Sequence, residues 1–218
     1  MISMWRIHRF FGDNYHRLFG VTVPSYVYDV GCLFIHIPKV AGISISYSLY
    51  GREIGHTRLS YYRDIPDDLH IFSVVRNPFE RVVSAWRFLS QGGLSNHPNG
   101  LKFNDTVLRN YDSFDSFVCN WLSAGNEYSF LHFIPQSEFL KSRDGSLSRI
   151  NCLLRFETLE NDYKTILNNF PSAKPLIPMN SSGKFDYRTL YTSRSYDCIR
   201  NLYAEDFHLL DYDDSFFL

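Results

Sequence analysis

The chain has 218 residues, a length that suits one domain, and 44% of them are hydrophobic, which is enough for a sizeable core. Its 22 Lys and Arg residues are balanced by 23 Asp and Glu residues, so the net charge is -1. A nucleic-acid-binding protein usually carries a basic excess, so we expect no nucleic-acid partner, and any anion site must be local.

The four cysteines predict no metal site and no disulfide framework. They form no CxxC pair and no Cys/His cluster with zinc spacing. Cys32 and Cys152 lie in apolar runs and are typical of small buried side chains in a reducing compartment. The chain has no stretch of roughly 18 consecutive apolar residues, so we expect no transmembrane segment.

The first 30 residues predict a helical extension that precedes the main domain at residues 31–218. Charged residues interrupt this extension, so it does not have the apolar core of a signal peptide. Its aromatic and aliphatic residues could share one helix face. We interpret that face as docking onto the domain, and peripheral contact with a membrane is the alternative.

Strands and helices alternate along the main domain. In chain order the sequence predicts a strand at 31–37, a helix at 43–50, a strand at 69–75, a helix beginning at Pro78, a loop at 91–104, a helix at 111–122, a strand at 152–156, a helix at 161–170 and a long helix at 189–207. This order favours a single α/β domain with a central, mainly parallel sheet flanked by helices.

The first motif is the segment FIHIPKVAGISI at residues 34–45. A buried strand runs into a tight turn that holds Lys39 and Gly42, and a helix follows. Backbone N–H groups and the positive end of the helix dipole then point at one spot, which makes an anion site. Gly42 lets the backbone approach a ligand closely, and Lys39 adds a full charge. The alternative is an ordinary junction between a strand and a helix.

The second motif is the segment SVVRNPFERVVSAW at residues 73–86. Arg76 stands at the carboxyl end of a strand, where open α/β sheets bind ligands, and its guanidinium group can grip a phosphate with two hydrogen bonds. Ser84 places a hydroxyl group on the helix that follows. The alternative is a structural ion pair for Arg76 and a surface position for Ser84.

Together the two motifs are specific. Residues 36–46 resemble the HIPKTAGTS-type loop that binds the 5′-phosphosulfate in sulfotransferases that use PAPS (3′-phosphoadenosine 5′-phosphosulfate). Residues 74–86 resemble the RNPxxRxxSxY element that binds the 3′-phosphate. The blocks HFIPQ at 132–136 and RFETLE at 155–160 resemble the carbohydrate branch of the family. The resemblance covers residues 31–212. It implies a P-loop-like sulfotransferase fold and transfer of a sulfuryl group from PAPS to a carbohydrate hydroxyl.

The chain departs from the family pattern in three places. Val40 stands where the family usually has Thr, Ile43 where it has Thr or Ser, and Trp86 where it has Tyr. The hydroxyl group of Ser44 remains, and backbone amides do most of the work of holding an anion. We therefore expect the donor site to be kept.

The resemblance also implies individual roles. Lys39 would contact the oxygen that bridges phosphate and sulfate, and Arg76 and Ser84 would hold the 3′-phosphate. The 5′-phosphate would lie on the residues Ala41, Gly42, Ile43 and Ser44. Two basic residues would close over the nucleotide, namely Lys184 and Arg188. Because a sulfuryl group carries less charge than a phosphoryl group, a magnesium clamp is less necessary, and we expect no metal.

The acceptor hydroxyl needs a base, and histidine is the usual candidate near neutral pH. His56 lies between the two PAPS motifs, in a segment similar to the one that supplies the base in the uronyl 2-O-sulfotransferase branch, and it is the first candidate. His132, which begins the HFIPQ block, is the second. A structural role is the alternative for each.

Three other functions are alternatives to a carbohydrate sulfotransferase. A nucleotide-dependent kinase would need the GxxxxGK[ST] loop, which is absent. A glycan-binding module without catalysis would not need Lys39, Arg76 and Ser84 at these spacings. A sulfotransferase for lipids or small molecules differs so little in sequence that it stays open. The resemblance together with the lack of a predicted membrane anchor favours a soluble, bacterial-type enzyme of the cytoplasm.

Overall fold

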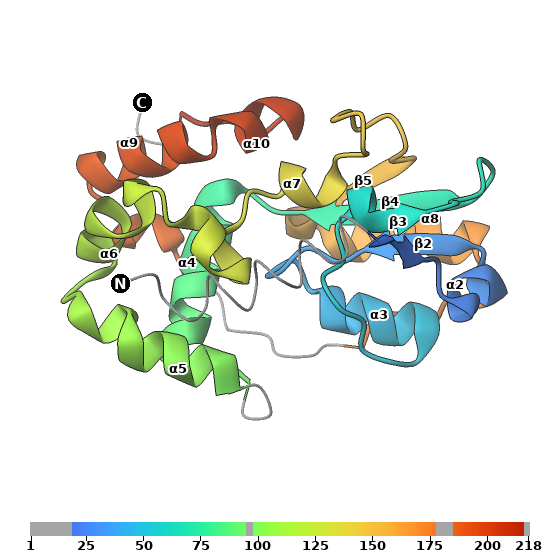
Figure 1. Cartoon of the computed structure of the whole chain (residues 1–218), viewed down its shortest axis with the longest axis horizontal. Coiled ribbons are helices and arrows are strands. Elements are labelled where there is room, and N and C mark those ends of the chain that lie inside the picture. Colours follow the sequence, from blue (N-terminus) through green and yellow to red (C-terminus); the bar gives the residue numbers. More distant parts are fainter. Residues whose placement is uncertain (1–18, 95–97, 178–184, 216–218) are drawn as a thin grey trace. The chain divides into compact units, whose positions relative to one another are not determined.

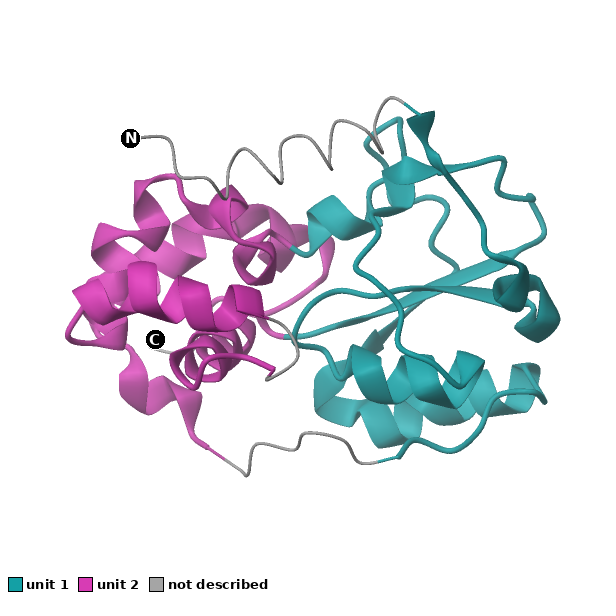
Figure 2. Cartoon of the chain, turned by 60° about the horizontal axis from the view of Figure 1, so that its bottom comes forward, with its two compact units in different colours: residues 1–76, 136–181 teal, residues 77–135, 182–218 magenta. Residues whose placement is uncertain are grey.

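The computed structural model describes residues 19–94, 98–177 and 185–215 (Figure 1). The chain divides into two compact units (Figure 2). The first unit takes residues 1–76 and 136–181, and the second takes residues 77–135 and 182–218.

A parallel sheet lies at the centre of the first unit. Within the described residues its strands are β2 (Cys32–Ile35), β4 (His70–Val75) and β5 (Cys152–Arg155), in the order β2-β4-β5. β2 and β4 are short apolar runs buried along almost their whole length, as expected of strands covered on both faces. A second parallel pair joins β1 (Val21–Thr22) to β3 (Tyr62–Arg63).

Helices flank this sheet (Figure 1). In chain order the first unit contains α2 (Ser25–Val30), α3 (Gly42–Tyr50), the 3-10 turn η1 (Leu59–Tyr61), α7 (Ser137–Leu140), the 3-10 turn η6 (Phe156–Thr158) and α8 (Leu159–Asn169). α3 and α8 are joined by a hydrogen bond of 2.7 Å between Ser48 Oγ and the hydroxyl of Tyr163. α3 ends, as predicted, at Gly51, whose φ of 67° favours glycine. The predicted α/β fold with a parallel sheet flanked by helices is confirmed.

The second unit is helical over its described residues. It contains α4 (Pro78–Ser90), α5 (Pro98–Thr106), α6 (Phe114–Asn120), α9 (Ser193–Leu202) and α10 (Ala204–Leu209), with the 3-10 turns η2 (Leu108–Asn110), η3 (Leu122–Ala124), η4 (Glu127–Ser129), η5 (Leu131–Phe133) and η7 (Tyr187–Leu190) between them. α4 begins as predicted, because Asn77 Oδ1 accepts a hydrogen bond of 2.9 Å from the amide of Phe79 and Pro78 occupies the first turn.

Two predicted elements were wrong. The expected loop at 91–104 contains the start of α5, because Pro98 suits a first turn and Gly100 lets the helix pack closely on the chain before it. A Cβ atom on Gly100 would lie 2.7 Å from the carbonyl oxygen of Gly92. The expected long helix at 189–207 is divided between η7, α9 and α10. A capping box between Thr192 and Ser195 starts α9 afresh.

All four cysteines lie in the described residues and have free thiols. Cys32 is buried, as predicted, whereas Cys152 is half-buried. The thiol of Cys198 donates a hydrogen bond of 3.8 Å to Sγ of Cys119, and the two cysteines form no disulfide. Burial, together with the neighbouring Cys198 thiol, raises the pKa of Cys119 to about 12, so this thiol stays protonated at neutral pH.

Residues 1–18, which hold most of the predicted docking or membrane-contact face, lie outside the described residues. Part of the rest of the predicted extension, residues 21–30, contributes β1 and α2 to the first unit. The domain boundary at residue 31 remains a prediction.

Candidate functional site

The turn between β2 and α3 has an unusual backbone. Lys39 and Ala41 adopt left-handed conformations, with φ angles of 72° and 62°. For a residue other than glycine this conformation costs roughly 1–2 kcal/mol, and such strain tends to collect at ligand-binding positions. Ala41 caps α3 without a side-chain hydrogen bond to the first turn. Because the first amides of a helix have no acceptor within the helix, the turn and α3 together form a place for an anion.

His36 fills the space beside Gly42. A Cβ atom on Gly42 would lie 1.9 Å from Cδ2 of His36, far inside contact distance. His36 is buried, and its Nδ1 donates a hydrogen bond of 3.2 Å to the carbonyl oxygen of Ile54. Burial, and then the charge of His56, lower the pKa of His36 well below its usual value, so its ring is neutral. Glycine is needed at position 42 to accommodate this ring, and the close approach of a ligand at this residue stays a prediction.

The ammonium group of Lys39 is largely shielded from solvent. Burial, and secondarily the positive charge of Arg76, lower the pKa of Lys39 to about 8. A guanidinium N–H of Arg76 donates a hydrogen bond of 3.3 Å to the carbonyl oxygen of Lys39. An anion bound beside both cations would offset their repulsion and favour the charged form of Lys39. The electrostatics therefore suit a negatively charged ligand.

Arg76 is positioned by contacts from three segments of the first unit. It follows β4 directly, as predicted, and it bonds the turn that contains Lys39. The side chain of Gln136 bonds the backbone of Arg76 at both the amide and the carbonyl group, at 2.9 and 2.8 Å. The guanidinium group lies 4.0 Å from the ring centroid of Phe156, a distance suited to a cation–π interaction. These contacts restrict the orientation of Arg76 before any ligand arrives.

His56 lies against the end of β2. Its Nδ1 donates a hydrogen bond of 2.9 Å to the carbonyl oxygen of His36, and the two rings have centroids 4.0 Å apart. Since a carbonyl oxygen only accepts, the neutral form of His56 carries its proton on Nδ1 and its lone pair on Nε2. His36 precedes Lys39 by three residues. The structure thus brings His56 to the strand end that leads into the Lys39 turn.

Ser44 is buried in the first turns of α3, and its hydroxyl donates a hydrogen bond of 2.5 Å to the carbonyl oxygen of Ile177. Its single proton is therefore engaged within the chain. Ile43, where the family usually has a hydroxyl group, is half-buried in the same turn. The backbone amides, which do not depend on side-chain identity, remain the main anion-binding groups here.

The remaining predicted residues belong to the second unit or lie outside the described residues. Ser84 is half-buried on α4, and Arg188 is exposed in η7. The ring of His132 packs among aromatic side chains, with ring centroids 5.3 Å from Phe130 and 5.4 Å from Phe88. Lys184 lies outside the described residues. A shared site for these residues with Lys39 remains a prediction.

Sequence reasoning assigned no site role to His36, Gln136 or Phe156. The last two lie within the blocks HFIPQ and RFETLE, so the blocks themselves were the available signal. Nothing in the sequence showed that both reach Arg76, because Gln136 lies 60 residues away along the chain.

In the described part of the chain, no group of three or more His, Cys, Asp or Glu residues could hold a metal ion. None of the helices seen in residues 19–94, 98–177 and 185–215 has the length and apolar character needed to cross a bilayer.

The sequence profile described as "Sulfotransferase family" matches residues 29–213, which include all of the residues assigned to the site above. No curated protein and no solved structure matches the chain significantly.

Proposed function

The chain belongs to the sulfotransferase family, and on that premise we propose that it moves a sulfuryl group from PAPS to a hydroxyl group of a carbohydrate acceptor. The observation that carries the choice of donor is that two cations, Lys39 and Arg76, lie next to each other near the start of α3. A guanidinium N–H of Arg76 donates a hydrogen bond to the carbonyl oxygen of Lys39, and both residues belong to the first unit. Family membership sets aside the nucleotide-dependent kinase.

The residues of this site fit the two phosphate groups of PAPS. The amides of Ala41 to Ser44 would hold the 5′-phosphate, and Lys39 would contact the oxygen that bridges it to the sulfate. Arg76 would hold the 3′-phosphate together with Ser84. The basic residues Lys184 and Arg188 would close over the nucleotide. The fit rests on the groups that the site offers to an anion, which are two cations and the amides of a helix start. Because burial and the neighbouring Arg76 destabilise the charged form of Lys39, a bound anion would stabilise that form.

His56 is the base in this proposal. It would take the proton of the acceptor hydroxyl at Nε2 while the acceptor oxygen forms its bond to sulfur. The bond between sulfur and the phosphate oxygen breaks, and Lys39 would stabilise the charge that develops on that oxygen. The products are a sulfate ester, 3′,5′-bisphosphate nucleotide (PAP) and a protonated His56. The hydrogen bond from Nδ1 to His36 supports this role, because it fixes the tautomer that presents Nε2 as the acceptor.

Carbohydrate is the acceptor class that the HFIPQ and RFETLE blocks favour, since they resemble the carbohydrate branch. The cytoplasm is the location that we propose, because the cysteine pattern of the sequence is typical of a reducing compartment.

Two measurements test this function. In calorimetry PAP should bind and ATP with magnesium should not, and PAP at about one hundred times its dissociation constant should stabilise the fold by about 2.7 kcal/mol. Binding of ATP with magnesium alone would overturn the choice of donor. In a screen with radiolabelled PAPS, label should enter glycans; label found only in lipids or small molecules would overturn the choice of acceptor.

A further inference from the structure

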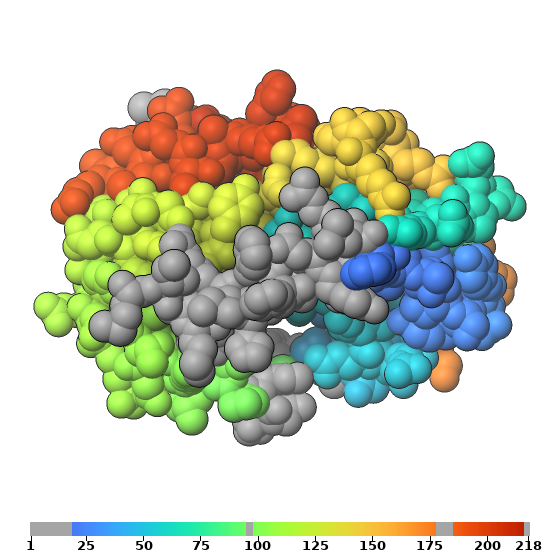
Figure 3. All heavy atoms as spheres, viewed as in Figure 1, coloured from blue at the N-terminus to red at the C-terminus, as the bar shows by residue number. Residues whose placement is uncertain are grey.

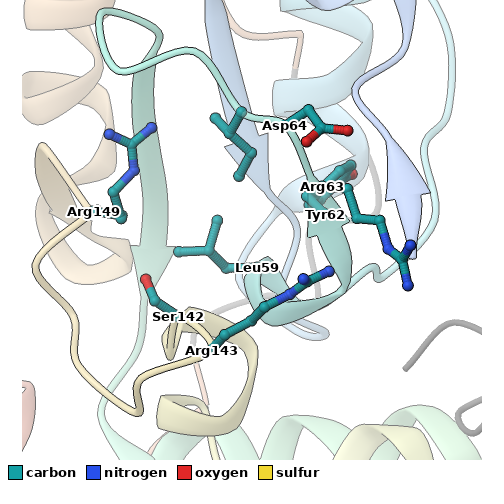
Figure 4. Close-up of a pocket in the computed structure, with 8 residues that line it drawn as sticks. Leu59, Tyr62, Arg63, Asp64, Ser142, Arg143 and Arg149 are labelled. Atoms are coloured by element: carbon teal, nitrogen blue, oxygen red, sulfur yellow. The ribbon is translucent and has the colours of Figure 1, made fainter. Parts of the chain in front are cut away.

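A pocket of about 440 Å³ opens in the first unit, and none of the residues assigned to the donor or the base lines it (Figure 4). One wall is the segment 59–65, which follows His56 along the chain. The other is the loop 142–149, which follows α7. The loop 142–149 reaches the molecular surface (Figure 3), where residues 143–145 are exposed.

Arginine dominates the charge of this pocket. Arg63, Arg143 and Arg149 line it, against one carboxylate from Asp64. Figure 4 shows Arg149 on one side and Arg143 on the other, with Leu59 between them, while the side chain of Arg63 points away from Leu59. In a chain whose net charge is -1, this is a local concentration of positive charge. Guanidinium groups bind the planar or tetrahedral oxyanions of carboxylates, sulfates and phosphates.

Backbone carbonyl groups hold the two inner arginines in place. Arg149 donates to the carbonyl oxygen of Pro66 at 2.8 Å and to the exposed carboxylate of Asp67 at 3.3 Å. Arg143 donates from Nε to the carbonyl oxygen of Ser60 at 3.2 Å. Within the described residues the two terminal NH₂ groups of Arg143 make no other hydrogen bond. Because the side chains are already oriented, an anion binds without the full loss of side-chain entropy.

Two ion pairs connect the segment that carries His56 to the second wall of the pocket. Arg58 forms an ion pair of 3.4 Å with Glu138 of α7, and Glu138 forms another of 3.0 Å with Lys141, directly before the second wall. Leu59, on the first wall, follows His56 by three residues, so at most about 10 Å of extended chain separates them. The first wall of the pocket is therefore continuous along the chain with the segment that carries His56.

We propose that this pocket binds an oxyanion, a sulfate ester or a carboxylate, carried by the acceptor. The assignment of the oxyanion to an acceptor rests on the proposed function, whereas the existence of the anion site does not. The pocket would thus select acceptors that already bear a negative group near the hydroxyl to be sulfated.

The test is a binding titration with sulfated dextran oligosaccharides, unsulfated dextran oligosaccharides and inorganic sulfate as probes. The titration is run with saturating PAP, so that the probes cannot bind at the Lys39 turn. It is repeated without PAP on the variant Lys39→Ala, in which that turn has lost its ammonium group. The repeat keeps the result independent of whether PAP binds. The variant is Arg143→Gln, at an exposed position, and the matched control is Arg109→Gln, an exposed arginine of the second unit that pairs with Asp105.

The sulfated oligosaccharide should bind the wild type, and Arg143→Gln should weaken it by about tenfold or more, the loss expected for a charge-assisted hydrogen bond. Arg109→Gln should bind as the wild type, and unsulfated dextran should not bind. Equal affinity in Arg143→Gln and wild type would overturn the site. Inorganic sulfate that binds as tightly as the oligosaccharide would overturn the acceptor role. Failure of PAP binding would count against the proposed function alone.

Discussion

Gln136 pairs with the backbone of Arg76 on both sides. The amide of Arg76 donates to Oε1 of Gln136 at 2.9 Å, and Nε2 of Gln136 donates to the carbonyl oxygen of Arg76 at 2.8 Å. Gln136 is fully buried. The side chain therefore takes the place of a neighbouring strand where β4 ends, and it satisfies two backbone groups that would otherwise need partners.

Gln136→Ala should lower both stability and affinity for PAP. Each buried backbone group left without a partner costs about 1–3 kcal/mol, so the free energy of unfolding should fall by about that amount or more. Affinity should fall because Arg76 loses its fixed orientation. Urea unfolding and calorimetry measure the two effects. Gln91→Ala, at the exposed end of α4, is the control and should change neither. Unchanged PAP affinity in Gln136→Ala would show that Arg76 is oriented without it.

Lys39→Ala and Arg76→Ala should have different kinetic effects. Arg76 is proposed to contact a phosphate that does not react, so its loss should mainly raise the KM for PAPS. Lys39 is proposed to contact the oxygen where charge develops, so its loss should mainly lower kcat. Steady-state kinetics at varied PAPS separate the two, with the exposed Lys102→Ala as control. Full turnover of Lys39→Ala at saturating PAPS would remove Lys39 from the chemical step.

The low pKa of Lys39 predicts a pH dependence. Burial lowers this pKa to about 8, whereas in the unfolded chain it returns to about 10.5. Between these values the unfolded state binds more protons, so the stability of the free protein should rise with pH relative to Lys39→Met. Affinity for PAP should do the opposite and fall above pH 8, because the anion prefers the charged ammonium group. Chemical unfolding and calorimetry at several pH values check both. Parallel curves for wild type and Lys39→Met would contradict the assignment.

His56→Ala should lower turnover by about 10²–10⁴-fold, the usual contribution of a general base, while PAP affinity stays near that of the wild type. His132→Ala is the matched comparison. If His132 helps to hold the acceptor instead, its loss should raise the acceptor KM more than it lowers kcat. Normal turnover in His56→Ala would transfer the role of base to His132.

Gly42→Ala should destabilise the first unit, because the added methyl group would overlap the buried ring of His36. The midpoint of thermal unfolding should fall, and the double variant Gly42→Ala with His36→Ala should recover part of the loss. Gly55→Ala is the control: a Cβ atom there meets nothing within 4 Å. If Gly42→Ala unfolds as the wild type while binding PAP more weakly, the glycine serves the ligand alone.

The sequence predicted the parallel strands of the first unit well, because short apolar runs between turns have few other interpretations. It also placed Lys39 and Arg76 in one region, since the carboxyl ends of adjacent parallel strands meet at one edge of the sheet. His56 was assigned by the resemblance to the family and not by this argument. It did not predict the partners of these residues. The bonds from Gln136 and the contact with Phe156 join segments distant in sequence, and local patterns carry no information about them. The long helix predicted at 189–207 was wrong for a local reason: Thr192 and Ser195 form a capping box that begins a new helix.

The left-handed backbone at Lys39 and Ala41 has a consequence for laboratory evolution. Glycine adopts this conformation freely, whereas other residues are strained by roughly 1–2 kcal/mol, and the extra unfolded-state entropy of glycine offsets only about 0.5–1 kcal/mol of that. A selection for heat resistance alone should therefore recover glycine at either position. Of the two outcomes, Ala41→Gly keeps the backbone amides that hold an anion, while Lys39→Gly removes the ammonium group. Stabilised variants recovered at random should accordingly fall into an active class and an inactive class, separated by which of these two neighbours has lost its strain.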